Sequence, residues 1–175
     1  MPDDALLALG SGVKLLILDV DGVLADGGLY YDHEGNVTKR FNVQDGLGIK
    51  IAQSFGLDIA VITGLKHRAV ELRVQELGIT EYHAGHVDKV PLMDAIRERL
   101  GLERSEVAYL GDDWVDVGIM GAVGLPMAVP NAQPEIFPLA KWVSRCPGGQ
   151  GAVREAIMFI LRCRGQYDAA WEKWS

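Results

Sequence analysis

Three features are scarce in this sequence: cysteine, clusters of basic residues and long hydrophobic runs. The chain of 175 residues has two cysteines, Cys146 and Cys163, which form no CxxC pair, so we expect neither a disulfide framework nor a zinc site. No apolar run approaches the ~20 residues that a transmembrane helix needs, so we expect no membrane contact. The formal net charge is −7 and no Lys/Arg run forms a basic patch, which argues against a nucleic-acid partner.

The rest of the composition is that of a globular protein. An apolar fraction of 49% and a charged fraction of 23% are ordinary, and 175 residues suit one domain with a small insertion. Residues 1–12 are acidic where a secretory signal would be basic, so a cytoplasmic location is the expectation. We therefore expect a single domain over residues 1–175, with both cysteines as inert thiols.

Short apolar runs alternate with amphipathic helical patterns along the chain. The predicted strands are Val13–Leu18, Leu57–Ile62, part of 79–84, Val107–Leu110, Pro126–Val129 and Trp142–Val143. Four helices are predicted. The first begins with Asp45 as its N-cap, and the second contains Val70, Val74 and Leu77 on one face. The third spans Val90–Leu100, and the last spans about Ala152–Arg162. Such alternation predicts an α/β fold, a Rossmann-like three-layer sandwich with a parallel sheet.

Residues 28–41 interrupt this alternation. Two β-prone stretches, Leu29–Tyr31 and Val37–Phe41, flank the polar turn Asp32–Asn36, which is typical of a β-hairpin. A hairpin between the first strand and the first helix would be an insertion in an α/β fold. Residues 151–175 would form a C-terminal helix and a tail, in which the role of Trp171 and Trp174 stays open.

Polar clusters follow three of the predicted strands, namely Asp19–Gly22, Thr63–Gly64 and Gly111–Asp113. Ligands of open parallel sheets bind outside these carboxyl ends of the strands. A carboxylate can attack phosphorus to form an aspartyl-phosphate, and a second carboxyl group can protonate the leaving oxygen and then deprotonate water. Because they lie two residues apart, Asp19 and Asp21 can share one crevice, and we predict them as nucleophile and as general acid and base.

A phosphate dianion beside several carboxylates requires a cation. Asp112 and Asp113 follow another strand and could meet Asp19 across the edge of the sheet. Oxygen-only ligands with room for water and phosphate favour Mg²⁺ over zinc. Asp113, and Asp116 one turn further along, would support this site by hydrogen bonding to the groups that bind the metal.

Other groups would hold the phosphate itself. Thr63 and Gly64 offer a hydroxyl and backbone N–H groups to a phosphate oxygen, and Lys89 could hold the phosphate and the nucleophile together. Each of these patterns alone is commonly just a turn, a loop or a solvated surface residue. Their joint occurrence in this order, three of them directly after buried-strand candidates, favours the catalytic interpretation.

The stretches LDVDG, VITG and GDDWVD, with Lys89, resemble the four motifs of the haloacid dehalogenase superfamily. Within it, DVDGVLADG, FNVQDGLGIK, VAYLGDD and GGQGAVREA are similar to the small capless subfamily IIIA phosphatases that act on 3-deoxy-D-manno-octulosonate 8-phosphate (KDO 8-phosphate). The resemblance implies Mg²⁺-dependent hydrolysis of that ester to KDO and phosphate, in the synthesis of a lipopolysaccharide precursor. It also implies a fold without a large cap domain.

The resemblance further implies roles for individual residues. Asp19 would be nucleophile and metal ligand, Asp21 would bind the metal through its backbone carbonyl while acting in catalysis with Lys89, and Asp112 would be the third protein ligand. The hairpin would pack with copies from other subunits in a homotetramer, and the GGQGAVRE segment would approach a neighbour's active site. Substrate contacts would come from Asn42, Val43, Gln44, Asp45, Gly46, Lys50, Thr63, Gly64, Arg73 and Lys89.

The sequence departs from the family pattern where a sugar acid would bind. Gln44, Leu65 and Gln150 stand at positions where the family usually has Arg, whereas Lys50 keeps a positive charge. An Arg fork suits a sugar carboxylate, and Leu65 cannot replace it. A related nonulosonate 9-phosphate, or a broader range of sugar phosphates, therefore stays open as substrate.

Two other classes of protein compete with a phosphatase. A phosphoacceptor signalling domain is disfavoured, because there the acid pair precedes a separate acceptor Asp on a later strand, whereas Asp21 follows the proposed nucleophile by two residues. A non-catalytic oligomeric or regulatory domain with the same fold is the second alternative. The intact set of Asp19, Asp21, Lys89 and Asp112 argues against it.

Overall fold

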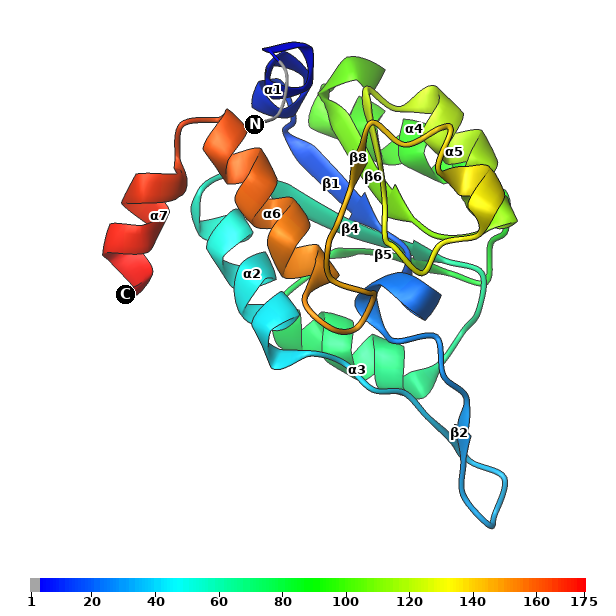
Figure 1. The fold of residues 1–175 in the computed structure, drawn as a ribbon. Helices are drawn as coiled ribbons and strands as arrows, with labels where there is room; N and C mark the ends of the chain where they lie inside the picture. The colour runs from blue at the N-terminus through cyan, green and yellow to red at the C-terminus, as the bar shows by residue number, and fades with distance from the viewer. Residues whose placement is uncertain (1–3) are drawn as a thin grey trace.

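One parallel β-sheet organises the computed structural model, which describes residues 4–175 (Figure 1). Six strands lie in the order β5-β4-β1-β6-β7-β8, and each neighbouring pair is parallel. The order along the sheet reverses beside β1, so the switch point falls between β1 and β6. The strands are β1 (Leu15–Leu18), β4 (Asp58–Thr63), β5 (Glu81–Ala84), β6 (Val107–Gly111), β7 (Leu125–Ala128) and β8 (Trp142–Val143).

The central strands are buried along their whole length. All residues of β1 and β6 are buried, as expected of nearly continuous apolar runs with helices on both sides. The register pairs Leu18 with Val61 of β4 and with Leu110 of β6. Because the three strands are held in this register, the polar residues that follow them meet at one edge of the sheet.

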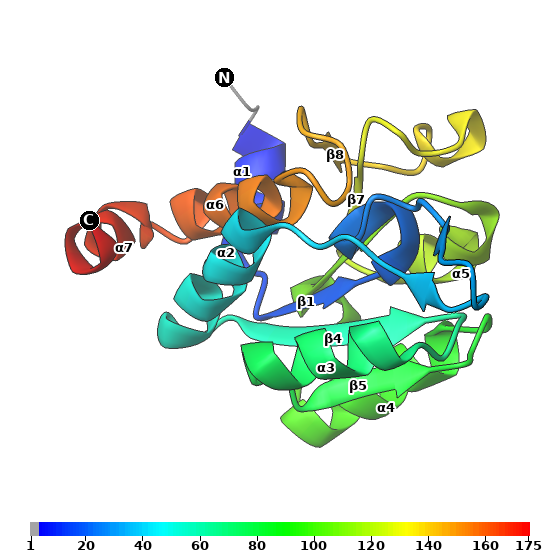
Figure 2. The same ribbon diagram turned by 90° about the horizontal axis from the view of Figure 1, so that it is seen from below.

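Helices cover both faces of the sheet and complete three layers (Figures 1 and 2). One face carries α1, α2, α3 and α6, the other carries α4 and α5, and α7 packs on the outside of α6. None of the helices in residues 4–175 combines the length and hydrophobicity that spanning a bilayer demands. Their bounds are α1 (Asp4–Ser11), α2 (Val43–Ser54), α3 (Arg68–Leu77), α4 (Val90–Leu100), α5 (Val117–Ala122), α6 (Ala152–Cys163) and α7 (Tyr167–Trp174).

Between β1 and α2 the chain forms a tight turn over Val20–Leu24 and then a β-hairpin. In the hairpin, β2 (Tyr30–Tyr31) pairs antiparallel with β3 (Val37–Thr38). Asp32 stabilises its tip, because the carboxylate accepts hydrogen bonds from the backbone N–H groups of residues 34 and 36. Figure 1 shows the hairpin projecting from the body of the molecule.

The fold class, the hairpin and each predicted strand are confirmed, with ends that differ by no more than a few residues. Helix α4 runs over Val90–Leu100 as predicted, and Gly101 ends it with a φ of 68°. The sequence predicted that the helix beginning at Ala152 is the last one. This prediction is wrong, because α7 follows after Gly165. Helices α1 and α5 were not predicted either.

Asp45 does not cap its own helix, which corrects the prediction. Asn42 does, since its side chain accepts the N–H of Gln44 at 2.7 Å. The buried Asp45 carboxylate instead accepts the backbone N–H groups of Gly151 (3.1 Å) and Arg154 (2.7 Å). The first N–H groups of a helix lack partners within it, so Asp45 ties the start of α6 to α2. Burial raises the pKa of Asp45, despite these hydrogen bonds.

Candidate active site

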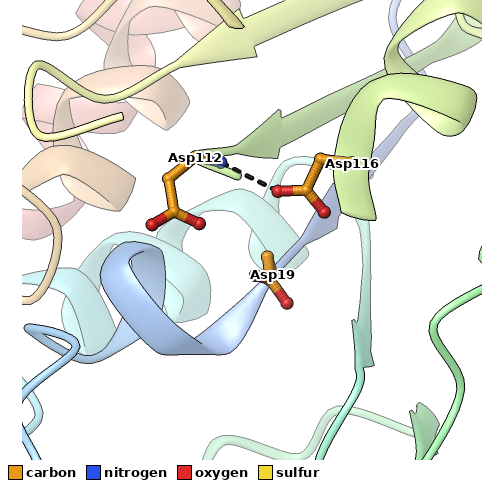
Figure 3. Close-up of side chains that lie close together, drawn as sticks. All are labelled: Asp19, Asp112 and Asp116. Carbon is orange, nitrogen blue, oxygen red and sulfur yellow. Dashed lines mark hydrogen bonds between the residues drawn. The ribbon is translucent and has the colours of Figure 1, made fainter. Parts of the chain in front are cut away.

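A cleft of about 250 Å³ lies at the carboxyl edge of the sheet. It combines residues at the ends of four strands, β1, β4, β5 and β6, whereas the sequence predicted polar clusters after three of them, β1, β4 and β6. Figure 3 shows Asp19 and Asp112 of this cleft together with Asp116. Three aliphatic side chains share its lining with the polar groups: Leu65, which the sequence placed where a sugar acid would bind, and Val87 and Val115, which were not predicted there. The lining residues are Asp19, Asp21, Thr63, Gly64, Leu65, Val87, Lys89, Asp112, Asp113 and Val115.

A buried lysine joins the nucleophile candidate to the rest of the cleft. The Lys89 side chain is only 1% exposed, and its Nζ lies 2.9 Å from Oδ1 of Asp19 and 2.7 Å from Oδ1 of Asp116. Lys89 also donates to the Tyr109 hydroxyl at 2.8 Å, and that hydroxyl donates to Asp116 at 2.6 Å. Tyr109, which sequence reasoning missed, thereby completes the hydrogen bonding of a cation that would be unstable unpaired.

The charges in this cluster shift one another's ionisation. Burial raises the pKa of Asp19 to about 6; Lys89 opposes the rise and Asp116 adds to it. Burial opposes the charge on Lys89, but the carboxylates of Asp19 and Asp116 outweigh it and raise the pKa of Lys89. Burial, followed by the negative charges of Asp19 and Asp116, raises the pKa of Asp112 to about 8.

The carboxylates fit a divalent cation, although they do not contribute equally. Oxygens of Asp19, Asp112 and Asp116 lie within 4.8 Å of one another (Figure 3). Both oxygens of Asp116 are already occupied: Oδ1 accepts from Lys89 and Tyr109, and Oδ2 from the backbone N–H of Asp112 (2.8 Å) and of residue 113 (3.2 Å). Oδ1 of Asp112, in contrast, is buried without a hydrogen-bond partner. Asp112 and Asp19 are therefore the carboxylates that suit the metal, and Asp116 orients them.

The turn after β1 brings Asp21 back toward the cleft. Gly22 has a φ of 81°, and a side chain there would overlap the carboxylate of Asp112, so the turn needs glycine. Asn131 donates to the carbonyl of Gly22 at 2.9 Å and accepts the N–H of Gly148 at 2.8 Å. This bridge, which spans 109 residues of sequence, could not be predicted from local patterns.

A lysine from the hairpin side reaches the acid and base candidate. Lys39 forms an ion pair with Oδ1 of Asp21, and its side chain is only 2% exposed. Sequence reasoning missed Lys39, because its partner lies 18 residues away and no motif covers it. The site therefore contains two lysines, one beside each of the first two aspartates.

The predicted sugar-binding residues on α2 and α3 do not line the cleft. Arg73 donates to the carbonyl of Asn42 at 3.2 Å and to Glu76 at 2.8 Å, while its Nε is buried without a partner. Gly46 allows the Arg73 guanidinium to approach α2, and Nζ of Lys50 lies near Gly78 at the far end of α3. Contact of the substrate with Asn42, Val43, Gln44, Asp45, Gly46, Lys50 and Arg73 stays a prediction.

The fold and the cleft, with Asp19, Asp21, Lys89 and Asp112 in place, are those of a haloacid dehalogenase-like hydrolase. A family model described as haloacid dehalogenase-like hydrolase matches residues 79–157. The chain belongs to the 3-deoxy-D-manno-octulosonate 8-phosphate phosphatase family of these hydrolases. That phosphatase of Escherichia coli is 43% identical over 164 residues, which cover 94% of this chain and 87% of the bacterial protein.

Solved structures agree with this membership. The phosphatase of Yersinia pestis superimposes with a TM-score of 0.91 and 39% identity, over 94% of this chain and 89% of the other. The phosphatase of Moraxella catarrhalis, in complex with a magnesium ion, a phosphate ion and KDO, gives a TM-score of 0.94 and 35% identity. That match covers 97% of this chain and 98% of the other.

The raised pKa values of Asp19 and Asp112 predict how pH and Mg²⁺ affect stability. Without a divalent cation, the folded chain keeps protons that the unfolded chain loses near the ordinary value of 3.8, so the free energy of unfolding falls as pH rises toward about 8. Mg²⁺ replaces the proton on Asp112, so its stabilising effect grows with pH. We expect the Mg²⁺-induced rise in Tm to be larger at about pH 8 than at about pH 5.

The measurement is thermal unfolding in EDTA and in Mg²⁺ across that pH range, with Asp112→Asn as the comparison. The variant is expected to lose most of both the pH slope and the Mg²⁺ effect. An equal Mg²⁺-induced shift at every pH, or an unchanged shift in Asp112→Asn, would show that the cation binds elsewhere.

Proposed function

We propose that this chain is a Mg²⁺-dependent phosphomonoesterase that works through a phosphorylated Asp19. The observation that carries the proposal is the ion pair between Lys89 and Asp19, 2.9 Å long and buried at the base of the cleft. It holds an ionised carboxylate at the carboxyl end of β1, with Asp21 two residues further on. A nucleophile, a proton donor and a fixed cation are the groups that phosphoryl transfer requires.

The first step breaks the ester. A carboxylate oxygen of Asp19 forms a bond to phosphorus as the bond from phosphorus to the leaving oxygen breaks, and the protonated Asp21 carboxyl donates its proton to that oxygen. Lys89 keeps Asp19 in place, and the hydroxyl of Thr63 with the N–H of Gly64, which line the same cleft, would bind phosphate oxygens. The products of this step are the free alcohol and a phosphorylated Asp19.

The second step restores the enzyme. Asp21, now ionised, takes a proton from a water molecule whose oxygen attacks phosphorus, and the bond between phosphorus and Asp19 breaks. Inorganic phosphate leaves, and Asp21 is again protonated for the next cycle. One carboxyl group thus serves both steps, which requires that it face the leaving oxygen and the attacking water from the same position.

Mg²⁺ would be held by carboxylate oxygens of Asp19 and Asp112 and by the backbone carbonyl of Asp21. When bound, it neutralises charge on the phosphoryl group and on the nucleophile. Asp113 is outside this set: it accepts the N–H of Trp114 at 2.6 Å and caps the short helix that carries Asp116. Asp116, with both oxygens occupied, supports the ligands.

The substrate that we propose is 3-deoxy-D-manno-octulosonate 8-phosphate, which would be hydrolysed to KDO and phosphate in lipopolysaccharide precursor synthesis. Support comes from relatives that bear this name along nearly the whole chain. A nonulosonate 9-phosphate or another sugar phosphate is the second candidate, because Leu65 lines the cleft with 59% of its surface exposed. A cytoplasmic location also stays a prediction that rests on the sequence.

We further propose that the chain assembles as a homotetramer through its hairpin. Leu29 (60% exposed), Tyr30 (47%) and Tyr31 (65%) are large apolar side chains exposed on a hairpin that projects from the body of the molecule. Exposed aromatic side chains gathered on one projecting element are typical of a protein interface. Light scattering after gel filtration should give the mass of four chains, and Leu29→Ser/Tyr31→Ser should give a smaller species. A monomeric wild type would refute the assembly and leave the chemistry untouched.

Phosphate release from the purified protein tests the proposed reaction. With Mg²⁺ we expect turnover of KDO 8-phosphate to exceed that of a nonulosonate 9-phosphate and of simpler sugar phosphates, and we expect none in EDTA. Asp19→Asn should lower kcat by about 10⁴-fold or more, since it removes the nucleophile. Asp168→Asn, an exposed carboxylate on α7, is the matched control and should leave kcat unchanged.

Each alternative has its own outcome. Preference for another ester would keep the mechanism and change the substrate. Absence of Mg²⁺-dependent turnover on every ester would favour a non-catalytic domain. Turnover that survives in Asp19→Asn would contradict the role of this residue.

A further inference from the structure

The side chain of Lys39, which follows the hairpin, reaches the active site. Lys39 follows β3, in a segment whose neighbours are largely exposed, yet its own side chain is only 2% exposed. Its ammonium group forms an ion pair with Oδ1 of Asp21, and this is its ion-pair partner among residues 4–175. A lysine is rarely buried to this extent without a role for its charge.

The two residues that follow Lys39 both contact other parts of the chain. Arg40 donates to the carbonyl of Gly149 at 3.1 Å and lies 3.7 Å from Oδ2 of Asp26. Phe41 forms an antiparallel bridge with Ala25, the residue that ends the turn after β1. These contacts hold the two residues that follow Lys39 against the chain that follows Asp21, so Lys39 is not a loosely placed surface lysine.

The two oxygens of the Asp21 carboxyl group have different surroundings. Oδ1 is held by Lys39, whereas Oδ2 has no hydrogen-bond or ion-pair partner within residues 4–175. The side chain remains 34% exposed and lines the cleft. A carboxyl group that donates a proton needs one free oxygen that faces the leaving group, and this arrangement leaves Oδ2 for that purpose.

We infer that Lys39 is a positioning residue for Asp21. Its ammonium group donates to Oδ1 and fixes the carboxyl group with Oδ2 free in the cleft, and Oδ2 is the oxygen from which a proton would pass to the leaving oxygen as the ester bond breaks and Asp19 takes the phosphoryl group. The inference rests on the proposed role of Asp21 as general acid. It gives the hairpin a part in catalysis within its own chain, separate from any part in assembly.

Two esters that differ in their leaving groups test this role. The alkoxide released from KDO 8-phosphate needs a proton, whereas the nitrophenolate released from p-nitrophenyl phosphate departs without one. In Lys39→Met we expect kcat/KM for KDO 8-phosphate to fall by about 10- to 100-fold, and kcat/KM for p-nitrophenyl phosphate to change by less than about threefold. Lys39→Arg, which keeps a cationic donor, should recover most of the loss.

Control variants separate the possible failures. Lys141→Met, at an exposed lysine before β8, should show no dependence on the ester, and thermal unfolding should confirm that each variant is folded. Asp21→Asn should show the same dependence as Lys39→Met, but more strongly. If it does and Lys39→Met lowers both rates equally, or neither, the inference is wrong and the proposed function stands. If Asp21→Asn lacks the dependence, the acid role of Asp21 falls, and the role of Lys39 falls with it.

Discussion

A lysine buried among carboxylates is the constraint on which this structure depends. Lys89 has 1% of its side chain exposed, and a cation in that position is tolerated only when its partners are in place. Asp19 and Asp116 supply the charge, and Tyr109 supplies a further hydrogen bond. Loss of one partner from a buried ion pair costs about 3–5 kcal/mol. The groups that make the edge of the sheet stable are therefore the groups that make it reactive.

The arrangement of the sheet places these partners correctly. Strands β1 and β6 lie side by side at the switch point, and their register brings Asp19 and the residues after Gly111 to the same level. Asp116 then fixes the loop after β6 by accepting the backbone N–H groups of residues 112 and 113. Asp112 is left with a buried oxygen that has no hydrogen-bond partner and a pKa raised to about 8, so this position suits a divalent cation.

The residues that line the cleft indicate the type of reaction but not the identity of the substrate. Within residues 4–175, the hairpin is the insertion between β1 and α2, and no cap domain covers the cleft there. The aliphatic residues that line the cleft are Leu65, Val87 and Val115. These aliphatic side chains cannot bind a sugar carboxylate. The proposed recognition of a sugar acid therefore relies on the predicted contacts on α2 and α3, and the proposed assembly through the hairpin would add groups from a neighbouring chain.

The sequence predicts the part of the site that follows strands, because apolar runs and the polar residues after them are local patterns. Asp19, Thr63 and Asp112 were found in this way, and the structure brings them together with Lys89, which was predicted from the order of the motifs. The groups that were missed act over long stretches of chain: Lys39 reaches Asp21 across 18 residues, and Asn131 reaches Gly22 across 109. Asp45 was misplaced for a similar reason, since it caps a helix that begins more than 100 residues later.

Detection of a phosphorylated Asp19 is the most direct test of the account. The protein would be mixed with radiolabelled p-nitrophenyl phosphate and Mg²⁺, quenched in acid within milliseconds, digested and mapped. We predict label in the peptide that contains Asp19, and more of it in Asp21→Asn, because loss of the base slows hydrolysis of the acyl phosphate. Turnover without any covalent label, or label on another residue, would contradict the account.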